Sequence, residues 1–116
     1  MGVPRLLVID DDVQLSACVA RMLRNVFLVV MAPPLIDARR LLAAEPFDVI
    51  LCNMQMPSMN GENFVAALPA RVGALVVFMS GDEEPKDVAS LHPRLLKPFT
   101  VGELLRAIAC RCPAAA

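Results

Sequence analysis

Charged and polar side chains stand at four separate points of the chain, each directly after a short apolar run. In chain order they are Asp10, Asp11 and Asp12, then Asn53, then Ser80, and finally Lys97. Adjacent carboxylates repel one another and favour a bound cation, and oxygen ligands of this kind suit Mg²⁺ or Mn²⁺. Because a hydroxyl and a lysine near that cation could hold phosphoryl oxygens, the set predicts phosphoryl-transfer chemistry.

These side chains can act together only if the apolar runs before them end at one edge of a sheet. Short runs that are apolar throughout are typical of strands buried on both faces. We expect strands at 6–9, 27–31, 48–52, 75–79 and 95–96, with helices between them and after the last. This alternation predicts an α/β fold, a doubly wound five-stranded parallel sheet that binds ligands at the carboxyl ends of its strands.

The helices are marked by apolar positions at three- and four-residue steps. In the first helix these positions are Leu15, Cys18, Val19, Met22, Leu23 and Val26, and in the last they are Val101, Leu104, Leu105 and Ile108. Asp12 lies near the N-terminus of the first helix. Asn60 and the pair Thr100 and Glu103 are placed to cap the third and last helices. Between the last two strands only 84–91 could be helical, so the fourth helix is predicted to be short or irregular.

Composition narrows the class of protein. With 116 residues, a net charge of −1 and 57% hydrophobic residues, the chain is expected to form one folded domain. The near-neutral charge argues against nucleic-acid binding, and no apolar run is long enough to span a membrane. A strand-like run begins at once, unlike a signal peptide, so a cytoplasmic location is expected. The thiols of Cys18, Cys52, Cys110 and Cys112 lack metal-site spacing and are interpreted as buried or incidental thiols in a reducing compartment.

Four motifs, in this order, make the chain resemble the receiver domains of two-component response regulators. They are residues 7–12, 48–61, 77–81 and 96–99, and the loop from Met56 to Gly61 is the most specific. The resemblance implies a CheY-like, flavodoxin-like (βα)5 fold and a phosphorylation-controlled conformational switch rather than an enzyme. It implies a sensor histidine kinase or phosphotransfer protein as one partner and an output domain or downstream protein as another. We expect the receiver domain at 1–112 and the start of an Ala/Pro linker at 113–116.

The resemblance also implies roles for individual residues. Asp10 and Asp11 would position Mg²⁺, and the backbone carbonyl of Gln55 would be a further ligand. Ser80 would be the switch hydroxyl, and Lys97 would pair with the phosphoryl group. The Lys97–Pro98 peptide is expected to be cis.

Asn53 stands where the resemblance places the phosphoacceptor aspartate, which is also a metal-contacting position. A neutral amide is a far poorer nucleophile than a carboxylate, so no acyl phosphate is expected. The missing charge predicts that Mg²⁺ binding is weakened or absent. One origin of Asn53 is an engineered Asp→Asn change, slightly favoured because the other site residues are retained. The alternative is a natural pseudo-receiver that acts as a phosphorylation-independent interaction domain.

Two departures from the resemblance favour that alternative. Arg94 occupies the position of the switch aromatic, and because an unpaired arginine is not buried, the usual coupling of that position to the Ser80 hydroxyl is not expected. The alternative is that Arg94 is simply a surface residue at a strand edge. The segment between Ser80 and Lys97 is short, which alters a face that receivers commonly use to dimerise. A homodimer is therefore only one alternative for this chain.

Two other classes share part of the pattern. A haloacid-dehalogenase-type phosphatase would use Asp10 as nucleophile and Asp12 as acid and base, but no second acidic pair follows Lys97. A flavodoxin-like nucleotide binder needs a phosphate-cradling loop after the first strand, where three aspartates stand instead. Both classes are disfavoured.

Overall fold

The structure is a computed structural model that describes residues 2–32, 35–54, 61–68, 73–81 and 93–109, with the backbone alone at 35–37 and 61–62. Its five strands form one parallel sheet in the order β2-β1-β3-β4-β5. The strands are β1 (Arg5–Ile9), β2 (Leu28–Met31), β3 (Val49–Asn53), β4 (Leu75–Ser80) and β5 (Arg94–Leu96). The predicted five-stranded parallel sheet is confirmed.

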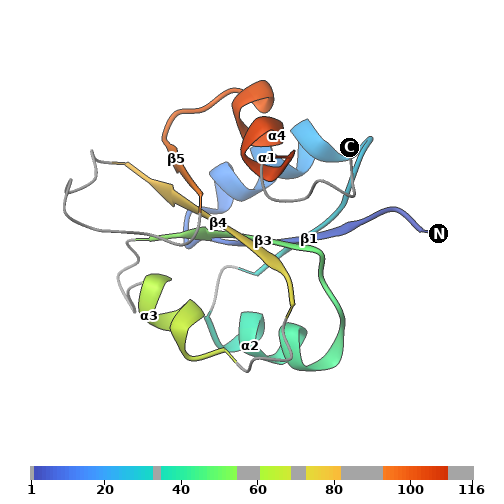
Figure 1. Cartoon of the computed structure of the whole chain (residues 1–116), viewed down its shortest axis with the longest axis vertical. Helices are drawn as coiled ribbons and strands as arrows, with labels where there is room; N and C mark the ends of the chain where they lie inside the picture. The colour runs from blue at the N-terminus through green and yellow to red at the C-terminus, as the bar shows by residue number, and fades with distance from the viewer. Residues whose placement is uncertain (1, 33–34, 55–60, 69–72, 82–92, 110–116) are drawn as a thin grey trace.

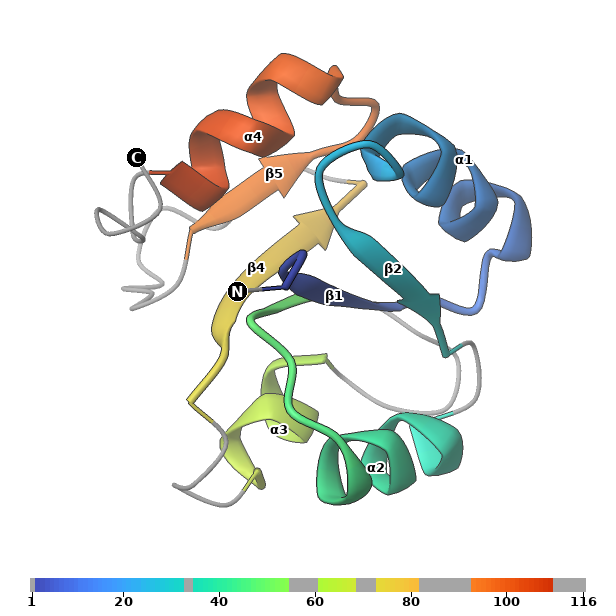
Figure 2. The same ribbon diagram turned by 90° about the vertical axis from the view of Figure 1, so that its right-hand side faces the viewer.

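Four helices cover the sheet in the described part of the chain. They are α1 (Val13–Leu23), α2 (Leu35–Ala44), α3 (Gly61–Ala66) and α4 (Val101–Ala109). Figure 1 shows α1 and α4 on one face of the sheet and α2 and α3 on the other, and Figure 2 shows the same layers from the side. This is the doubly wound arrangement that the alternating pattern predicts.

The strand order creates a switch point between β1 and β3. From β1 the chain first adds β2 on one side and then returns to add β3, β4 and β5 on the other. Parallel pairing aligns Leu6 with Val49 and Ile9 with Cys52, so the residues that follow these pairs, Asp10 and Asn53, leave the sheet side by side. Such a point at the carboxyl ends of the strands is where open α/β sheets bind ligands.

Side chains of successive strand residues build two cores because they point to opposite faces. In β1, Leu7 and Ile9 belong to the cluster under α2 and α3, whereas Leu6 and Val8 belong to the cluster under α1 and α4. The strands β3 and β4 are buried almost throughout, as apolar runs predict. The edge strand β2 differs because nothing pairs with its outer side in the described chain, and its two terminal residues are exposed.

The capping box of the last helix agrees with the sequence-based expectation, and Asp12, expected near the start of the first helix, caps that helix. Asp12 is the N-cap of α1, and its Oδ1 accepts a hydrogen bond from the Leu15 N–H at 3.1 Å. At α4 the capping box is complete, since Thr100 Oγ1 accepts from the Glu103 N–H at 3.0 Å and Glu103 Oε1 accepts from the Thr100 N–H at 2.8 Å. These bonds satisfy backbone donors that a helix start leaves open.

The predicted apolar faces of α1 and α4 are partly wrong. In α1 the buried line consists of Ser16, Val19 and Leu23, and Cys18 is exposed because it lies well off that line. Four residues placed in the two core faces are exposed in the structure or lie beyond the helix: Cys18, Val26, Val101 and Leu105. Leu104 and Ile108 carry the contact of α4 with the sheet.

Several expectations lie outside the described residues. They concern Gln55, the Asn60 cap, the short helix at 84–91, the thiols of Cys110 and Cys112, and the linker at 113–116. Among the described helices, none is long and apolar enough to cross a membrane.

Candidate functional site

Asp10 is the centre of the polar cluster at the switch point. It follows β1 directly and has no solvent exposure. Its Oδ1 accepts hydrogen bonds from the Asp12 N–H at 2.9 Å and from Asn53 Nδ2 at 3.3 Å, and its Oδ2 accepts one from Lys97 Nζ at 3.0 Å. A buried carboxylate needs this compensation, and charge-assisted bonds to a cation supply the strongest part.

Asn53 and Ser80 reach the same edge from the neighbouring strands. Asn53 is the last residue of β3 and Ser80 the last of β4, and both are buried. The register pairs Asn53 with Met79, so Ser80 extends one residue beyond that pair toward the site edge. The Met54 N–H donates to the Met79 carbonyl at 2.9 Å, which continues the β3–β4 pairing past the end of β3.

Lys97 reaches the cluster from the β5 edge of the sheet. It follows β5, and its main-chain N–H donates to the Ser80 carbonyl at 2.7 Å. Its side chain therefore reaches across the ends of the two intervening strands to pair with Asp10. The Lys97–Pro98 peptide is cis, as expected.

The three aspartates after β1 have different surroundings. Asp10 is buried, whereas Asp11 and Asp12 are exposed. Loss of hydration, and then the neighbouring Asp10 carboxylate, raise the pKa of Asp11 above its ordinary value, which Lys97 partly opposes. The Asp12 carboxylate caps α1, and the Asp12 N–H donates to Asp10. Both bonds argue against Asp12 as the acid and base of a phosphatase.

The arrangement does not fit a divalent cation as it stands. Mg²⁺ prefers several oxygen ligands in near-ideal octahedral geometry. Both oxygens of Asp10 already accept hydrogen bonds, one of them from a positively charged ammonium group. In the described part of the chain no three His, Cys, Asp or Glu side chains are grouped to hold a metal ion. A cation at Asp10 would share this carboxylate with the Lys97 ammonium group, whose positive charge opposes it.

Two residues near the cluster, Arg94 and Cys52, have surroundings that the sequence did not reveal. Arg94 is half-buried in the edge strand β5, and its Nε and Nη1 atoms are shielded from solvent, so it is neither fully exposed nor fully buried. Pairing of β5 with β4 accounts for this position, since Arg94 lies beside Phe78. Cys52 lies buried under the cluster, where desolvation and then the Asp10 charge raise the pKa of its thiol to about 12.

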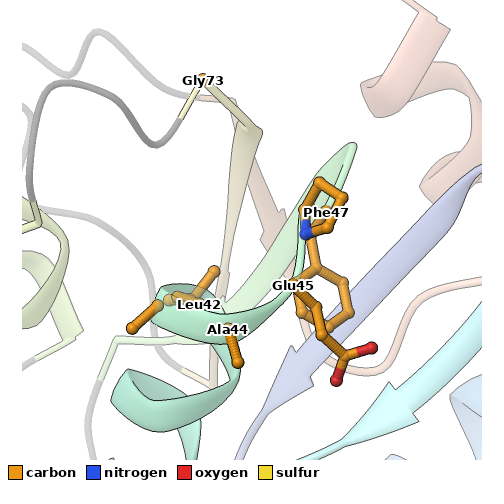
Figure 3. A pocket seen from close by; sticks show the side chains of 7 residues that line it. Leu42, Ala44, Glu45, Phe47 and Gly73 are labelled. Carbon is orange, nitrogen blue, oxygen red and sulfur yellow. The ribbon is translucent and has the colours of Figure 1, made fainter.

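A surface pocket lies at the opposite end of the sheet. Figure 3 shows its lining between the end of α2 and the start of β3, with Gly73 from the segment before β4. Its one carboxylate, Glu45, pairs with Arg5, whose guanidinium also lies 5.0 Å from the centre of the Phe47 ring. The cluster at Asp10, unlike the described lining of this pocket, combines a carboxylate with a lysine and a hydroxyl.

The fold and the cluster together define a class, a doubly wound α/β domain with carboxylates and a lysine at its switch point. A family model described as "Response regulator receiver domain" matches residues 6–109. The chain therefore belongs to the response regulator receiver domain family of two-component signalling.

Curated relatives agree with this family. The chain is 31% identical to Protein PetR of Rhodobacter capsulatus over 108 residues, which cover 88% of this chain and 46% of PetR. It is 29% identical to the hydrogenase transcriptional regulatory protein HoxA of Cupriavidus necator over 107 residues, or 86% of this chain and 22% of HoxA. The chain thus spans less than half the length of these relatives.

Solved structures show the same fold. Chemotaxis protein CheY4 of Vibrio cholerae superposes with a TM-score of 0.82 at 24% identity, over 94% of this chain and 98% of that one. A sensor protein of Polaromonas sp. JS666 gives a TM-score of 0.84 at 20% identity, over 99% and 100% of the two chains. At these identities the likeness supports the CheY-like fold alone.

Proposed function

We propose that this chain is the receiver module of a longer two-component signalling protein and that it works without a phosphoryl group on residue 53. The observation that carries the proposal is the amide of Asn53 donating to the buried Asp10 carboxylate. That amide stands in the cluster where the family resemblance places the phosphoacceptor carboxylate.

The chemistry of the amide supports this proposal. A phosphoacceptor attacks phosphorus with a carboxylate oxygen that carries a full negative charge, whereas the amide is neutral and a far poorer nucleophile. In this chain the Asn53 side chain is also turned to donate to Asp10. The roles of Ser80 as switch hydroxyl and Lys97 as phosphoryl partner therefore belong to a form with an aspartate at position 53.

The partners follow from the family. Receiver domains interact with histidine kinases and with output domains, and the curated relatives include one named as a transcriptional regulator and one named as a sensor histidine kinase. We assign the receiver to residues 1–112 and a linker toward an output domain to 113–116. The relatives are longer than this chain, which supports an output partner.

Two origins of Asn53 are compatible with a receiver that carries no phosphoryl group on residue 53. In the first, Asn53 replaces an aspartate in a working receiver, which agrees with the retention of Asp10, Ser80 and Lys97 around it. In the second, the chain is a natural pseudo-receiver that binds its partner directly. The half-buried Arg94 supports the second, since it stands where the family resemblance places an inward-turning aromatic.

Beryllium fluoride distinguishes a substituted working receiver from a natural pseudo-receiver, because it mimics a phosphoryl group when it is bound to a carboxylate. We expect the amide NMR signals of Ser80 and Lys97 in the chain with Asn53 to stay unchanged when beryllium fluoride and Mg²⁺ are added. In Asn53→Asp the same signals should shift if the rest of the switch is intact, and their failure to shift would support the natural pseudo-receiver. A shift in the Asn53 form equal to that in Asn53→Asp would overturn the proposal.

A further inference from the structure

The charge arrangement around Asp10 has a consequence for metal binding. Asp10 is fully buried, and its nearest cation is the Lys97 ammonium at 3.0 Å, whose side chain is 24% exposed. A buried carboxylate without a cation close by is strongly destabilised, and a hydrogen-bonded cation offsets much of that cost. Lys97 thus supplies at Asp10 the charge that a metal ion would otherwise supply.

The backbone fixes Lys97 in this place. Its N–H bond to the Ser80 carbonyl anchors the start of its side chain at the end of β4, and the chain beyond it leads into the capped α4. The ammonium group is therefore delivered to Asp10 by the sheet itself rather than by a mobile surface chain. The pair links the segment after β5 to the segment after β1.

Asn53 completes the arrangement. Its amide donates to the second oxygen of Asp10, and the Asp12 N–H donates to that same oxygen. An aspartate at position 53 would be a second negative group beside Asp10 and would compete for the Lys97 ammonium. The neutral amide does not compete with Asp10 for the Lys97 ammonium.

We propose that Lys97 is the resident cation of this site and that its pair with Asp10, completed by the Asn53 amide, excludes divalent metal ions. The inference rests on the proposed function, because it concerns the regulation of the same receiver site. It adds to the proposed function that the site stays free of metal because Lys97 remains paired with Asp10.

A titration with MgCl₂ by calorimetry tests the proposal, with KCl balancing the ionic strength. Lys97→Met removes the internal cation and should bind Mg²⁺ about tenfold or more tightly than the unchanged chain, because a positive charge no longer opposes the ion. Arg21→Gln, at the exposed far end of α1, removes the same charge elsewhere and should leave the affinity unchanged. Equal affinities of the unchanged chain and Lys97→Met would overturn the proposal.

A second measurement needs no change at Lys97. The chain has two lysines, Lys86 and Lys97, so Lys86→Arg leaves a single ammonium signal in a ¹H–¹⁵N spectrum. We expect this signal to be visible, because its protons are hydrogen-bonded to Asp10, and to stay in place when millimolar Mg²⁺ is added. Its disappearance on addition of Mg²⁺ would show that the metal displaces Lys97. Neither result depends on phosphorylation, so the proposed function and this inference can fail separately.

Discussion

Asn53 Nδ2 lies 3.3 Å from Oδ1 of the buried Asp10 carboxylate, at the switch point between β1 and β3. The register of these strands fixes this proximity, since Asp10 and Asn53 each follow directly after the aligned pair Ile9 and Cys52. Two carboxylates at this separation would repel each other, whereas an amide donates a hydrogen bond. The residue type at position 53 thus determines both whether the site has a carboxylate nucleophile and how its charges balance.

Placing a carboxylate at position 53 should make the site dependent on a metal ion. We expect Asn53→Asp to lower the free energy of unfolding by about 1–3 kcal/mol without Mg²⁺, because a hydrogen bond to a buried charged group is lost. Mg²⁺ should restore much of that loss and bind more tightly than to the unchanged chain. Urea unfolding with and without Mg²⁺ measures both effects.

The matched control for this change is Asn25→Asp, which adds the same charge in the exposed turn after α1. Its stability should change little and should not respond to Mg²⁺. Equal Mg²⁺ binding by the unchanged chain and by Asn53→Asp would contradict the account of the charge balance.

The buried hydroxyl of Ser16 in α1 should be dispensable for stability. Ser16 is 1% exposed, and its Oγ has no hydrogen-bond partner among the described residues. We expect Ser16→Ala to raise the free energy of unfolding by about 1 kcal/mol, because alanine favours helix and removes an unsatisfied polar atom. Cys18→Ala, at an exposed position of the same helix, isolates the helix preference. A loss of stability in Ser16→Ala would show that the hydroxyl has a partner.

The thiol of Cys52 should be inert in the folded protein. Burial, and then the Asp10 charge, raise its pKa to about 12 from an ordinary value of 9.0, so the reactive thiolate is scarce at neutral pH. Brief treatment with iodoacetamide should modify the exposed Cys18 and leave Cys52 unmodified, as judged by peptide mass. Comparable modification of both thiols in the folded state would be inconsistent with the burial of Cys52.

The same shift in pKa gives the stability a pH dependence. The folded protein holds the Cys52 proton more tightly than the unfolded chain, so this contribution is complete below pH 9 and is lost as pH rises toward about 12. Stability measured over that range should fall less steeply in Cys52→Ala. An unchanged slope in Cys52→Ala would contradict the shift.

The capping box of α4 should contribute measurably to stability. Thr100→Ala removes the Oγ1 that accepts the Glu103 N–H, and we expect a loss of about 1 kcal/mol in the free energy of unfolding. Thr100→Ser keeps the hydroxyl and should retain most of the stability. If both variants unfold at the same denaturant concentration as the unchanged chain, the box does not stabilise α4.

Much of the sheet could be predicted because its strands contain apolar runs that polar residues interrupt only at their ends. Residues such as Leu51 and Val77 lie in runs with no polar break, and burial on both faces is the one environment that suits them. The convergence of Asp10, Asn53, Ser80 and Lys97 followed from parallel strands, whose carboxyl ends meet at one edge. The caps at Asp12 and Thr100 were predictable because capping depends on local spacing.

Other features depend on tertiary contacts that local patterns do not contain. The spacing of Cys18 and Leu105 fits a helical apolar face, but the width of the face that meets the sheet is set by packing, and both are exposed. The sequence left the exposure of Arg94 open, and pairing of β5 with β4 makes it half-buried. The pairing of Lys97 with Asp10 depends on the strand order.

The intact mass of the chain after incubation with acetyl phosphate and Mg²⁺ tests the central claim most directly, with Asn53→Asp treated in parallel. The account predicts that the chain with Asn53 keeps its mass, because the amide that donates to Asp10 forms no acyl phosphate. A stable phosphoryl adduct on the chain with Asn53 would contradict it.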